Sequence, residues 1–273
     1  MKNSNSDCND HHRANGTAYR LTGLRDAPTV VLIHGLGLNQ NVWDEYVAVF
    51  EKQYRVLSYD LLGHGNSVMP ESEPSLTVYA LQLRQLMDEL DIETAVLIGF
   101  SLGGMINRRF AMDNPERVSA LGILNSPHER SPEAQKLVEQ RVADTGAGGL
   151  GATLSATLER WFTPEFLDSN KEYVQQVADW VLANDPVGYT QCRQVLAVGV
   201  TELIRPEPPV KPPTIVITCE NDSGSTPAMS LAIASEIDGA ETVILPRLQH
   251  MGLVEQPELF IEPLLTFLKA KKL

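Results

Sequence analysis

The chain has 273 residues, of which 43% are hydrophobic and 21% are charged, as is ordinary for a globular protein. Its 22 Lys and Arg residues against 35 Asp and Glu residues give a formal net charge of −13. Nucleic acids and anionic membranes attract cationic patches, and no apolar run approaches the length that spans a bilayer. We therefore expect neither a nucleic-acid partner nor a membrane partner, and nothing in the sequence indicates an oligomeric state.

Residues 1–15 are polar and are predicted to form a disordered or loosely held tail. They contain no apolar segment of the kind that a secretory signal requires. The three cysteines, Cys8, Cys192 and Cys219, are scattered and match neither a disulfide framework nor a metal-ligand spacing. We therefore expect a cytoplasmic protein without a bound metal.

From residue 29 onward, short apolar runs alternate with segments whose apolar residues recur at helical spacing. Strands are predicted at residues 29–33, 55–59, 95–99 and 119–124. Helices are predicted at residues 42–51, 76–90 and 102–112. This alternation, with strands apolar on both faces, predicts a parallel sheet that helices cover on both sides.

The alternation breaks near Ser126 and Pro127. Residues 131–204 show helical patterns without a buried strand, and five prolines fall within residues 205–213, which excludes a helix or a central strand there. The earlier alternation then resumes with elements at residues 214–218, 228–237, 242–245 and 257–269. We therefore predict three parts: the tail, an α/β core of residues 16–126 plus 206–273, and a helical cap of residues 127–205.

The segment Gly99–Gly103 matches the pattern G-x-S-x-G between a predicted strand and a predicted helix. A serine on so sharp a turn has strained backbone geometry, and glycines two residues before and after it avoid collisions. The turn exposes the Ser101 hydroxyl and directs the Leu102 amide toward a developing oxyanion. Ser101 is therefore predicted to be a nucleophile.

A serine hydroxyl needs a base, and four histidines follow predicted strands: His34, His64, His128 and His250. Ligands of doubly wound sheets bind beyond these strand ends, so position does not decide among them. If the chain follows the order nucleophile, acid, histidine, only His250 lies after a suitable acid. His34 and His64 are then expected to brace loops through hydrogen bonds.

The acid should follow the strand at residues 214–218, where Glu220 and Asp222 are both candidates. We prefer Asp222, because it lies further into the loop and can reach a histidine on a neighbouring loop. Its role would be to orient the imidazole and stabilise the imidazolium. A second oxyanion donor is expected from His34–Gly37, where the Leu36 amide is our candidate.

Four further residues are candidates for substrate binding. Trp161 and Phe162 either pack the cap or line an apolar acyl pocket, and His128 directly follows a predicted strand, where ligands bind. Arg130, like Arg108 and Arg109, either binds a substrate carboxylate or forms a surface ion pair. The glycine pattern at residues 146–151 follows a helical stretch and not a strand, so it does not indicate a dinucleotide site. We therefore expect no cofactor.

Six motifs in this order resemble the α/β-hydrolase superfamily over nearly all of the chain after the tail: HGLGLNQNVWD (34–44), YDLLGHGNS (59–67), GFSLGG (99–104), NPERV (114–118), CEND (219–222) and QHMGLVEQPELF (249–260). The resemblance implies the α/β-hydrolase fold, a mostly parallel doubly wound sheet with a helical cap inserted after the sixth strand. It also implies Ser101 as nucleophile, Asp222 as acid and His250 as base.

Within the superfamily, the chain is most similar in style to the 3-oxoadipate enol-lactonase and esterase group, through residues 160–164 and 184–189. We therefore expect a serine hydrolase that cleaves a small carboxylic ester or lactone through an acyl-enzyme. One alternative is a carbon–carbon bond hydrolase or acyl transferase with the same triad. Another is a small-molecule receptor on a hydrolase fold.

Overall fold

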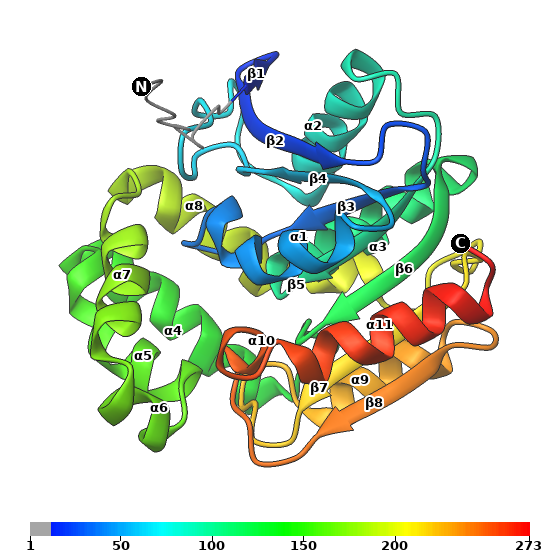
Figure 1. Ribbon diagram of the computed structural model, residues 1–273. Coiled ribbons are helices and arrows are strands. Elements are labelled where there is room, and N and C mark those ends of the chain that lie inside the picture. The colour runs from blue at the N-terminus through cyan, green and yellow to red at the C-terminus, as the bar shows by residue number, and fades with distance from the viewer. Residues whose placement is uncertain (1–11) are drawn as a thin grey trace, which may run out of the picture.

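The computed structural model describes residues 12–273, and within them one sheet of eight strands forms the centre of the fold (Figure 1). The strands are β1 (His12–Ala14), β2 (Thr17–Gly23), β3 (Thr29–Ile33), β4 (Arg55–Tyr59), β5 (Ala95–Phe100), β6 (Val118–Leu124), β7 (Thr214–Cys219) and β8 (Glu241–Leu245). Their order is β1-β2-β4-β3-β5-β6-β7-β8. β2 is antiparallel to β1 and β4, and every other pairing is parallel.

Helices cover both faces of this sheet. The helices of the core are α1 (Asp44–Phe50), α2 (Leu76–Glu89), α3 (Leu102–Asp113), α9 (Pro227–Ser235), α10 (Gly252–Glu255) and α11 (Glu258–Ala270), of which α1, α3, α9 and α11 pack directly on the sheet. In Figure 1, α1 and α11 lie in front of the sheet, and α3 and α9 lie behind it. The central strands β3, β5 and β7 are consequently buried along their whole length. The predicted mostly parallel, doubly wound sheet is confirmed.

The winding direction reverses at β3, because β4 pairs on one side of it and β5 on the other. Such a reversal opens a crevice beyond the carboxyl ends of the two strands, where α/β proteins bind their ligands. The loop that begins at His34 and the turn at Ser101 both leave the sheet at this crevice.

Five helices are inserted between β6 and β7, at the position after the sixth strand where the sequence predicts a cap. These inserted helices are α4 (Pro132–Gly148), α5 (Leu154–Trp161), α6 (Pro164–Ser169), α7 (Lys171–Leu182) and α8 (Pro186–Val198). They gather at one side of the core (Figure 1). No helix within residues 12–273 has both the length and the hydropathy to cross a bilayer.

Local sequence explains where several of the inserted helices begin. Three of them start with a capping residue followed by proline: Ser131–Pro132, Thr163–Pro164 and Asp185–Pro186. Each capping side chain accepts a hydrogen bond from a backbone amide of the first turn, which would otherwise have no acceptor within the helix. Proline fits next, since its fixed φ suits the first helical position and it has no amide hydrogen to satisfy.

The tail predicted at residues 1–15 extends too far, because residues 12–14 form a strand. Residues 1–11 lie outside the described residues, but β1 and β2 form an antiparallel hairpin that pairs with β4. The turn between them consists of Asn15 and Gly16, with φ angles of 49° and 78°. Asn-Gly suits a two-residue hairpin turn that needs positive φ at both positions. This dipeptide was the signal in the sequence for the hairpin.

Candidate active site

Ser101 occupies a sharp turn between β5 and α3. Its φ of 55° and ψ of −113° lie outside the regions that residues with a side chain normally adopt. A Cβ atom on Gly99 would collide with the backbone of Gly103, and one on Gly103 would collide with the carbonyl oxygen of Ile33. The two glycines therefore permit the close approach of strand and helix that makes this turn possible.

Polar contacts from the end of β6 hold this turn in place. The Ser126 hydroxyl donates to the carbonyl oxygen of Ser101 at 3.0 Å. The buried guanidinium of Arg108 donates to Ser126 Oγ at 3.2 Å and to the carbonyl oxygens of Gly104 at 2.9 Å and Pro127 at 2.7 Å. The turn at Ser101 is thus tied to its neighbouring strand, and Arg108, a candidate for binding a substrate carboxylate, is instead buried in these contacts.

The two backbone amides predicted to hold an oxyanion belong to Leu102 and Leu36. Leu102 is the first residue of α3, and the amides of a first helical turn have no acceptor within the helix. The loop after β3 passes close to the serine, because a Cβ atom on Gly35 would lie 3.2 Å from Ser101 Cβ. Leu36, the next residue, lines the same cavity as Ser101. Both predicted amide donors therefore belong to segments that meet at the serine.

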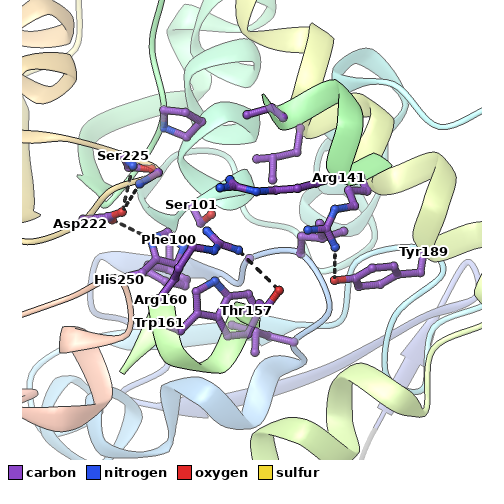
Figure 2. Close-up of a pocket in the computed structure, with 18 of the residues that line it drawn as sticks. Phe100, Ser101, Arg141, Thr157, Arg160, Trp161, Tyr189, Asp222, Ser225 and His250 are labelled. Carbon is purple, nitrogen blue, oxygen red and sulfur yellow. Dashed lines mark hydrogen bonds and ion pairs between the residues drawn. The ribbon is translucent and has the colours of Figure 1, made fainter. Parts of the chain in front are cut away.

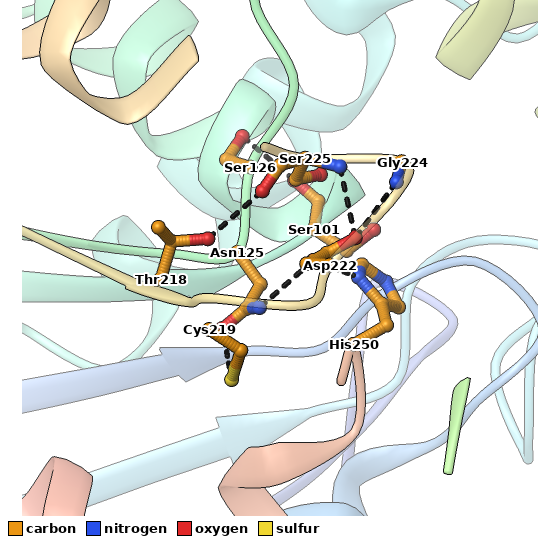
Figure 3. Close-up of polar contacts among 9 residues, drawn as sticks. All are labelled: Ser101, Asn125, Ser126, Thr218, Cys219, Asp222, Gly224, Ser225 and His250. Atoms are coloured by element: carbon orange, nitrogen blue, oxygen red, sulfur yellow. Dashed lines mark hydrogen bonds and ion pairs between the residues drawn. The ribbon is translucent and has the colours of Figure 1, made fainter. Parts of the chain in front are cut away.

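His250 and Asp222 form a close pair next to Ser101 (Figures 2 and 3). His250 Nδ1 lies 2.6 Å from Asp222 Oδ2. Because an ionised carboxylate only accepts hydrogen bonds, Nδ1 is the protonated nitrogen and Nε2 is left as an acceptor. The imidazole ring packs against Phe100 and Trp161, with ring centroids 4.8 Å and 6.0 Å away.

The carboxylate of Asp222 is buried and accepts hydrogen bonds on both oxygens. Oδ1 accepts from the amides of Gly224 at 2.8 Å and Ser225 at 2.9 Å, and Oδ2 accepts from Asn125 Nδ2 at 2.8 Å as well as from His250 (Figure 3). Burial by itself would raise the pKa of Asp222. The interaction with His250 and the hydrogen bonds outweigh burial and hold that pKa below its usual value. The acid therefore stays ionised.

The alternative candidates have other contacts. Glu220 is exposed, and its Oε2 accepts a hydrogen bond from the Arg247 amide at 2.9 Å. His34 Nε2 accepts from the Leu61 amide at 3.0 Å, so its Nδ1 donates to the Gly35 carbonyl oxygen at 2.8 Å. His64 Nδ1 lies 3.2 Å from the Leu62 carbonyl oxygen. His34 thus joins two loops, whereas the hydrogen bond of His64 stays within its own turn.

The buried histidine pair makes stability sensitive to acid. Burial lowers the pKa of His34 to about 4, and burial together with the neighbouring His34 lowers that of His64 to about 3. Below pH 6.5 the unfolded chain binds protons that the folded protein cannot, so the free energy of unfolding falls as pH falls. We expect a loss of roughly 3–5 kcal/mol between pH 6.5 and 4.5, at up to ~1.4 kcal/mol per histidine and pH unit.

Urea unfolding at several pH values between 4.5 and 7.5 measures this dependence. The variant His64→Gln removes one of the two titrating groups and should reduce the slope by about half, whatever its own stability. A slope that is unchanged in the variant would show that other groups cause the acid sensitivity.

The predicted substrate residues divide into two pairs. Trp161 and Arg130 line the cavity that contains Ser101 and His250. Figure 2 shows Trp161 beside them. Phe162 and His128 do not line it.

Phe162 and His128 were predicted to bind the substrate, but their side chains pack elsewhere. Phe162 is fully buried and stacks on Phe166 with ring centroids 5.2 Å apart. His128 is buried with Nε2 3.2 Å from Glu236 Oε1. In both cases a neighbouring residue in sequence faces the cavity while the predicted one packs into the interior.

Several residues at the site were not predicted. Asn125 follows β6 and donates to Asp222, which follows the adjacent strand β7. A polar residue directly after a buried strand was the available signal for it. Three more arginines line the cavity, namely Arg141, Arg160 and Arg193. Within residues 12–273, no cluster of three or more His, Cys, Asp or Glu side chains could hold a metal ion.

Hydrogen bonds join the inserted helices to the segment that carries His250. The Met251 amide donates to the Trp161 carbonyl oxygen at 2.7 Å, and Gln249 Nε2 donates to the Glu159 carbonyl oxygen at 3.0 Å. Glu255 accepts from the amide and the hydroxyl of Thr163 at 2.8 Å and 2.6 Å. We call these four hydrogen bonds the histidine clip, because they hold the chain on both sides of His250.

Comparison with known proteins matches the chain to one family. The family model described as the alpha/beta hydrolase family matches residues 30–262. The chain belongs to this family. As an alpha/beta hydrolase it is similar to 3-oxoadipate enol-lactonase 2 of Acinetobacter baylyi, with 28% identity over 244 residues that make up 89% of each chain. It is also similar to (E)-2-((N-methylformamido)methylene)succinate hydrolase of the same organism, with 26% identity over 84% of this chain and 86% of that one.

Solved structures of alpha/beta hydrolases agree with the fold. The enol-lactonase of Burkholderia xenovorans superposes with a TM-score of 0.85 at 30% identity, covering 93% of this chain and 98% of that one. A hydrolase of Pseudomonas aeruginosa superposes with a TM-score of 0.84 at 26% identity, covering 92% and 94%. These relatives indicate that the chain is a hydrolase acting on ester or lactone bonds.

Proposed function

We propose that this alpha/beta hydrolase is a serine hydrolase that cleaves a small carboxylic ester or lactone through an acyl-enzyme. The observation that carries the proposal is the buried His250–Asp222 pair at 2.6 Å, which lines one cavity with a serine on a strained strand-to-helix turn. Its triad would be Ser101, His250 and Asp222. The enol-lactonases among its relatives support an ester or lactone as the substrate class.

In the proposed mechanism, Ser101 Oγ attacks the substrate carbonyl carbon while His250 Nε2 takes the hydroxyl proton. Nε2 is suited to this, since Nδ1 already donates to Asp222. The amides of Leu36 and Leu102 would stabilise the oxyanion. Collapse of the tetrahedral intermediate breaks the bond to the leaving oxygen, which takes the proton from His250 and leaves an ester on Ser101.

Deacylation repeats these steps with water. His250 removes a proton from water, the hydroxide attacks the acyl carbon, and Ser101 regains its proton as the carboxylic acid leaves. For a lactone, the leaving hydroxyl stays attached to the acyl group, so the product is a single hydroxy or keto acid. Every proton is carried by His250, so the mechanism requires no cofactor.

We further propose that the inserted helices form the cap over this site. Trp161 and Tyr189, from α5 and α8, line the cavity opposite the sheet residues Ser101 and Phe100. An apolar wall of this kind suits the carbon skeleton of an acyl group. A cytoplasmic location is supported by the buried, unpaired thiols Cys192 and Cys219.

The proposal is tested by initial-rate hydrolysis of p-nitrophenyl acetate through decanoate. We expect steady turnover, with the preferred chain length reporting the size of the acyl pocket. Brief incubation with the preferred ester, acid quenching and peptide mass spectrometry should place the acyl group on Ser101. A single burst with an adduct that persists would instead identify a receptor, and an acyl group on another residue would exclude the proposed nucleophile.

A further inference from the structure

Four arginines line the cavity that contains Ser101. Arg130 precedes α4, Arg141 and Arg160 belong to α4 and α5, and Arg193 belongs to α8. Arg193 is buried and the other three are half-buried. In Figure 2, Arg141 and Arg160 reach the space around Ser101 from different helices. Segments far apart in the sequence therefore bring four positive charges to one small site.

Acidic side chains do not neutralise this cluster. The chain has 35 Asp and Glu residues and a net charge of −13. Yet among residues 12–273, none of the four arginines forms an ion pair with an acidic side chain. Asp222, the acidic residue that lines the cavity, is occupied by His250 and three other donors. Buried or half-buried charges are costly unless they are paired, so this arrangement calls for a compensating anion.

Two of the arginines are partly held by neutral groups. Arg130 donates to the carbonyl oxygens of Ala197 at 3.0 Å and Leu196 at 3.3 Å. Arg193 donates to the Tyr189 hydroxyl at 3.3 Å. Neutral acceptors orient these guanidinium groups without cancelling their charge, so the two side chains are fixed and remain positive.

The other two arginines have most of their donors free. Arg160 has one long hydrogen bond, to Thr157 Oγ1 at 3.5 Å. The guanidinium of Arg141 has no hydrogen-bond partner within the described part of the chain. Arg160 is also close enough to Asp222 for the carboxylate to affect its pKa, which places it at the triad end of the cavity. A guanidinium has five N–H donors in a planar fork that matches a carboxylate.

Electrostatics shows that the four charges share one environment. Burial, together with the charges of Arg141 and Arg193, lowers the pKa of Arg160 to about 10. Burial and a neighbouring arginine also lower the pKa of Arg130 and of Arg141. All three remain protonated at neutral pH. A ligand with negative charge would relieve both the burial and the mutual repulsion.

We propose that the cavity binds a substrate that carries two carboxylates in addition to its scissile ester or lactone. A carboxylate has two oxygens, so one such group bridges two guanidinium groups, and four guanidinium groups match two carboxylates. A substrate with one carboxylate would leave two of the guanidinium groups without a carboxylate partner. This inference rests on the proposed hydrolase function for the identity of the third, scissile group. It assigns Arg141 and Arg160 as the residues that select the substrate.

Binding of three matched acids to the Ser101→Ala protein tests the proposal without requiring turnover. Butyrate, succinate and tricarballylate each present one carboxylate to the acyl site, with zero, one or two further carboxylates. Calorimetric titration at low salt should show affinity rising at least about tenfold with each added carboxylate. The differences should shrink as salt is added, because partly exposed charges are screened. Equal affinities for succinate and tricarballylate, or for all three acids, would overturn the proposal.

Two variants test whether Arg141 and Arg160 cause the preference for additional carboxylates. Arg141→Gln and Arg160→Gln should each reduce the preference for tricarballylate over butyrate by about tenfold or more. Arg109→Gln is the matched control, because Arg109 pairs with Asp113 and Glu202 outside the cavity and should leave the preference unchanged. A preference that survives both cavity variants would exclude these arginines as its source.

The serine hydrolase proposal and the carboxylate-binding proposal can each be contradicted without the other. Hydrolysis of neutral p-nitrophenyl acetate by the wild-type protein, with an acyl group on Ser101, supports the serine hydrolase whatever the acids show. Conversely, a graded preference for carboxylates without any turnover would support the anion site and contradict the hydrolase.

Discussion

Replacing Ser101 by alanine is expected to lower kcat for p-nitrophenyl ester hydrolysis by at least about a thousandfold. The variant lacks the oxygen that would form the acyl-enzyme, whereas the cavity, the His250–Asp222 pair and the amides of Leu36 and Leu102 remain. Alanine also fits the turn with its φ of 55° no worse than serine, so the fold should be retained. Initial rates of both proteins at saturating ester measure the change.

Two observations control this experiment. Thermal unfolding and circular dichroism should show that the Ser101→Ala protein is folded, and the acids described above should still bind to it. A folded variant that retains more than about a tenth of the wild-type rate would show that another nucleophile carries the reaction. That result would contradict the proposal that Ser101 is the nucleophile.

The second large effect is expected for Asp222→Asn, which should lower kcat by about a thousandfold to ten-thousandfold. Both backbone donors, from Gly224 and Ser225, meet one oxygen of Asp222, so the amide oxygen of asparagine should take that position. The amide nitrogen would then face His250 Nδ1 and Asn125 Nδ2, which are donors in the wild type. Nδ1 would have to become the acceptor, which moves the ring proton to Nε2 and blocks the base.

The matched control is Glu220→Gln, since Glu220 is the other acid in the same loop. Its carboxylate is exposed and accepts from the Arg247 amide, which glutamine can still satisfy. We expect less than a twofold change in kcat for this variant, measured on the same ester. If Glu220→Gln were the inactive variant and Asp222→Asn the active one, the acid of the proposed triad would be wrong.

The sequence predicted the central sheet well because its strands are buried on both faces. Strands such as β3 and β5 are continuous apolar runs bounded by turn residues, a pattern that local sequence displays directly. The strand β2 was missed because most of its side chains are only partly buried, so no such run marks it. Its position depends on pairing with β4, a contact between distant segments that local patterns do not reveal.

The predicted triad residues come together in the structure. They could be predicted because the turn at the serine requires particular residues at fixed positions, which the sequence displays. The turn at Ser101 requires Gly99 and Gly103, and the sheet fixes which loops end beside it. The arginines carry no comparable signature. An arginine on an amphipathic helix is usually solvated, and only the packing of α4, α5 and α8 directs these side chains into one cavity. The same limit explains the prediction of Phe162 instead of Arg160, two positions away.

The histidine clip determines which wall of the cavity can move. Since α5 and the start of α6 are bonded to the chain on both sides of His250, a displacement of that wall would drag the imidazole away from Asp222. Within residues 12–273, the α4 wall has no hydrogen bond to the chain around His250, and α4 buries only Thr145 among its 17 residues while it packs on α8 and on the short helix Leu150–Thr153. We therefore expect substrate to enter past α4, beside Arg130 and Arg141, and the base to keep its position while it does.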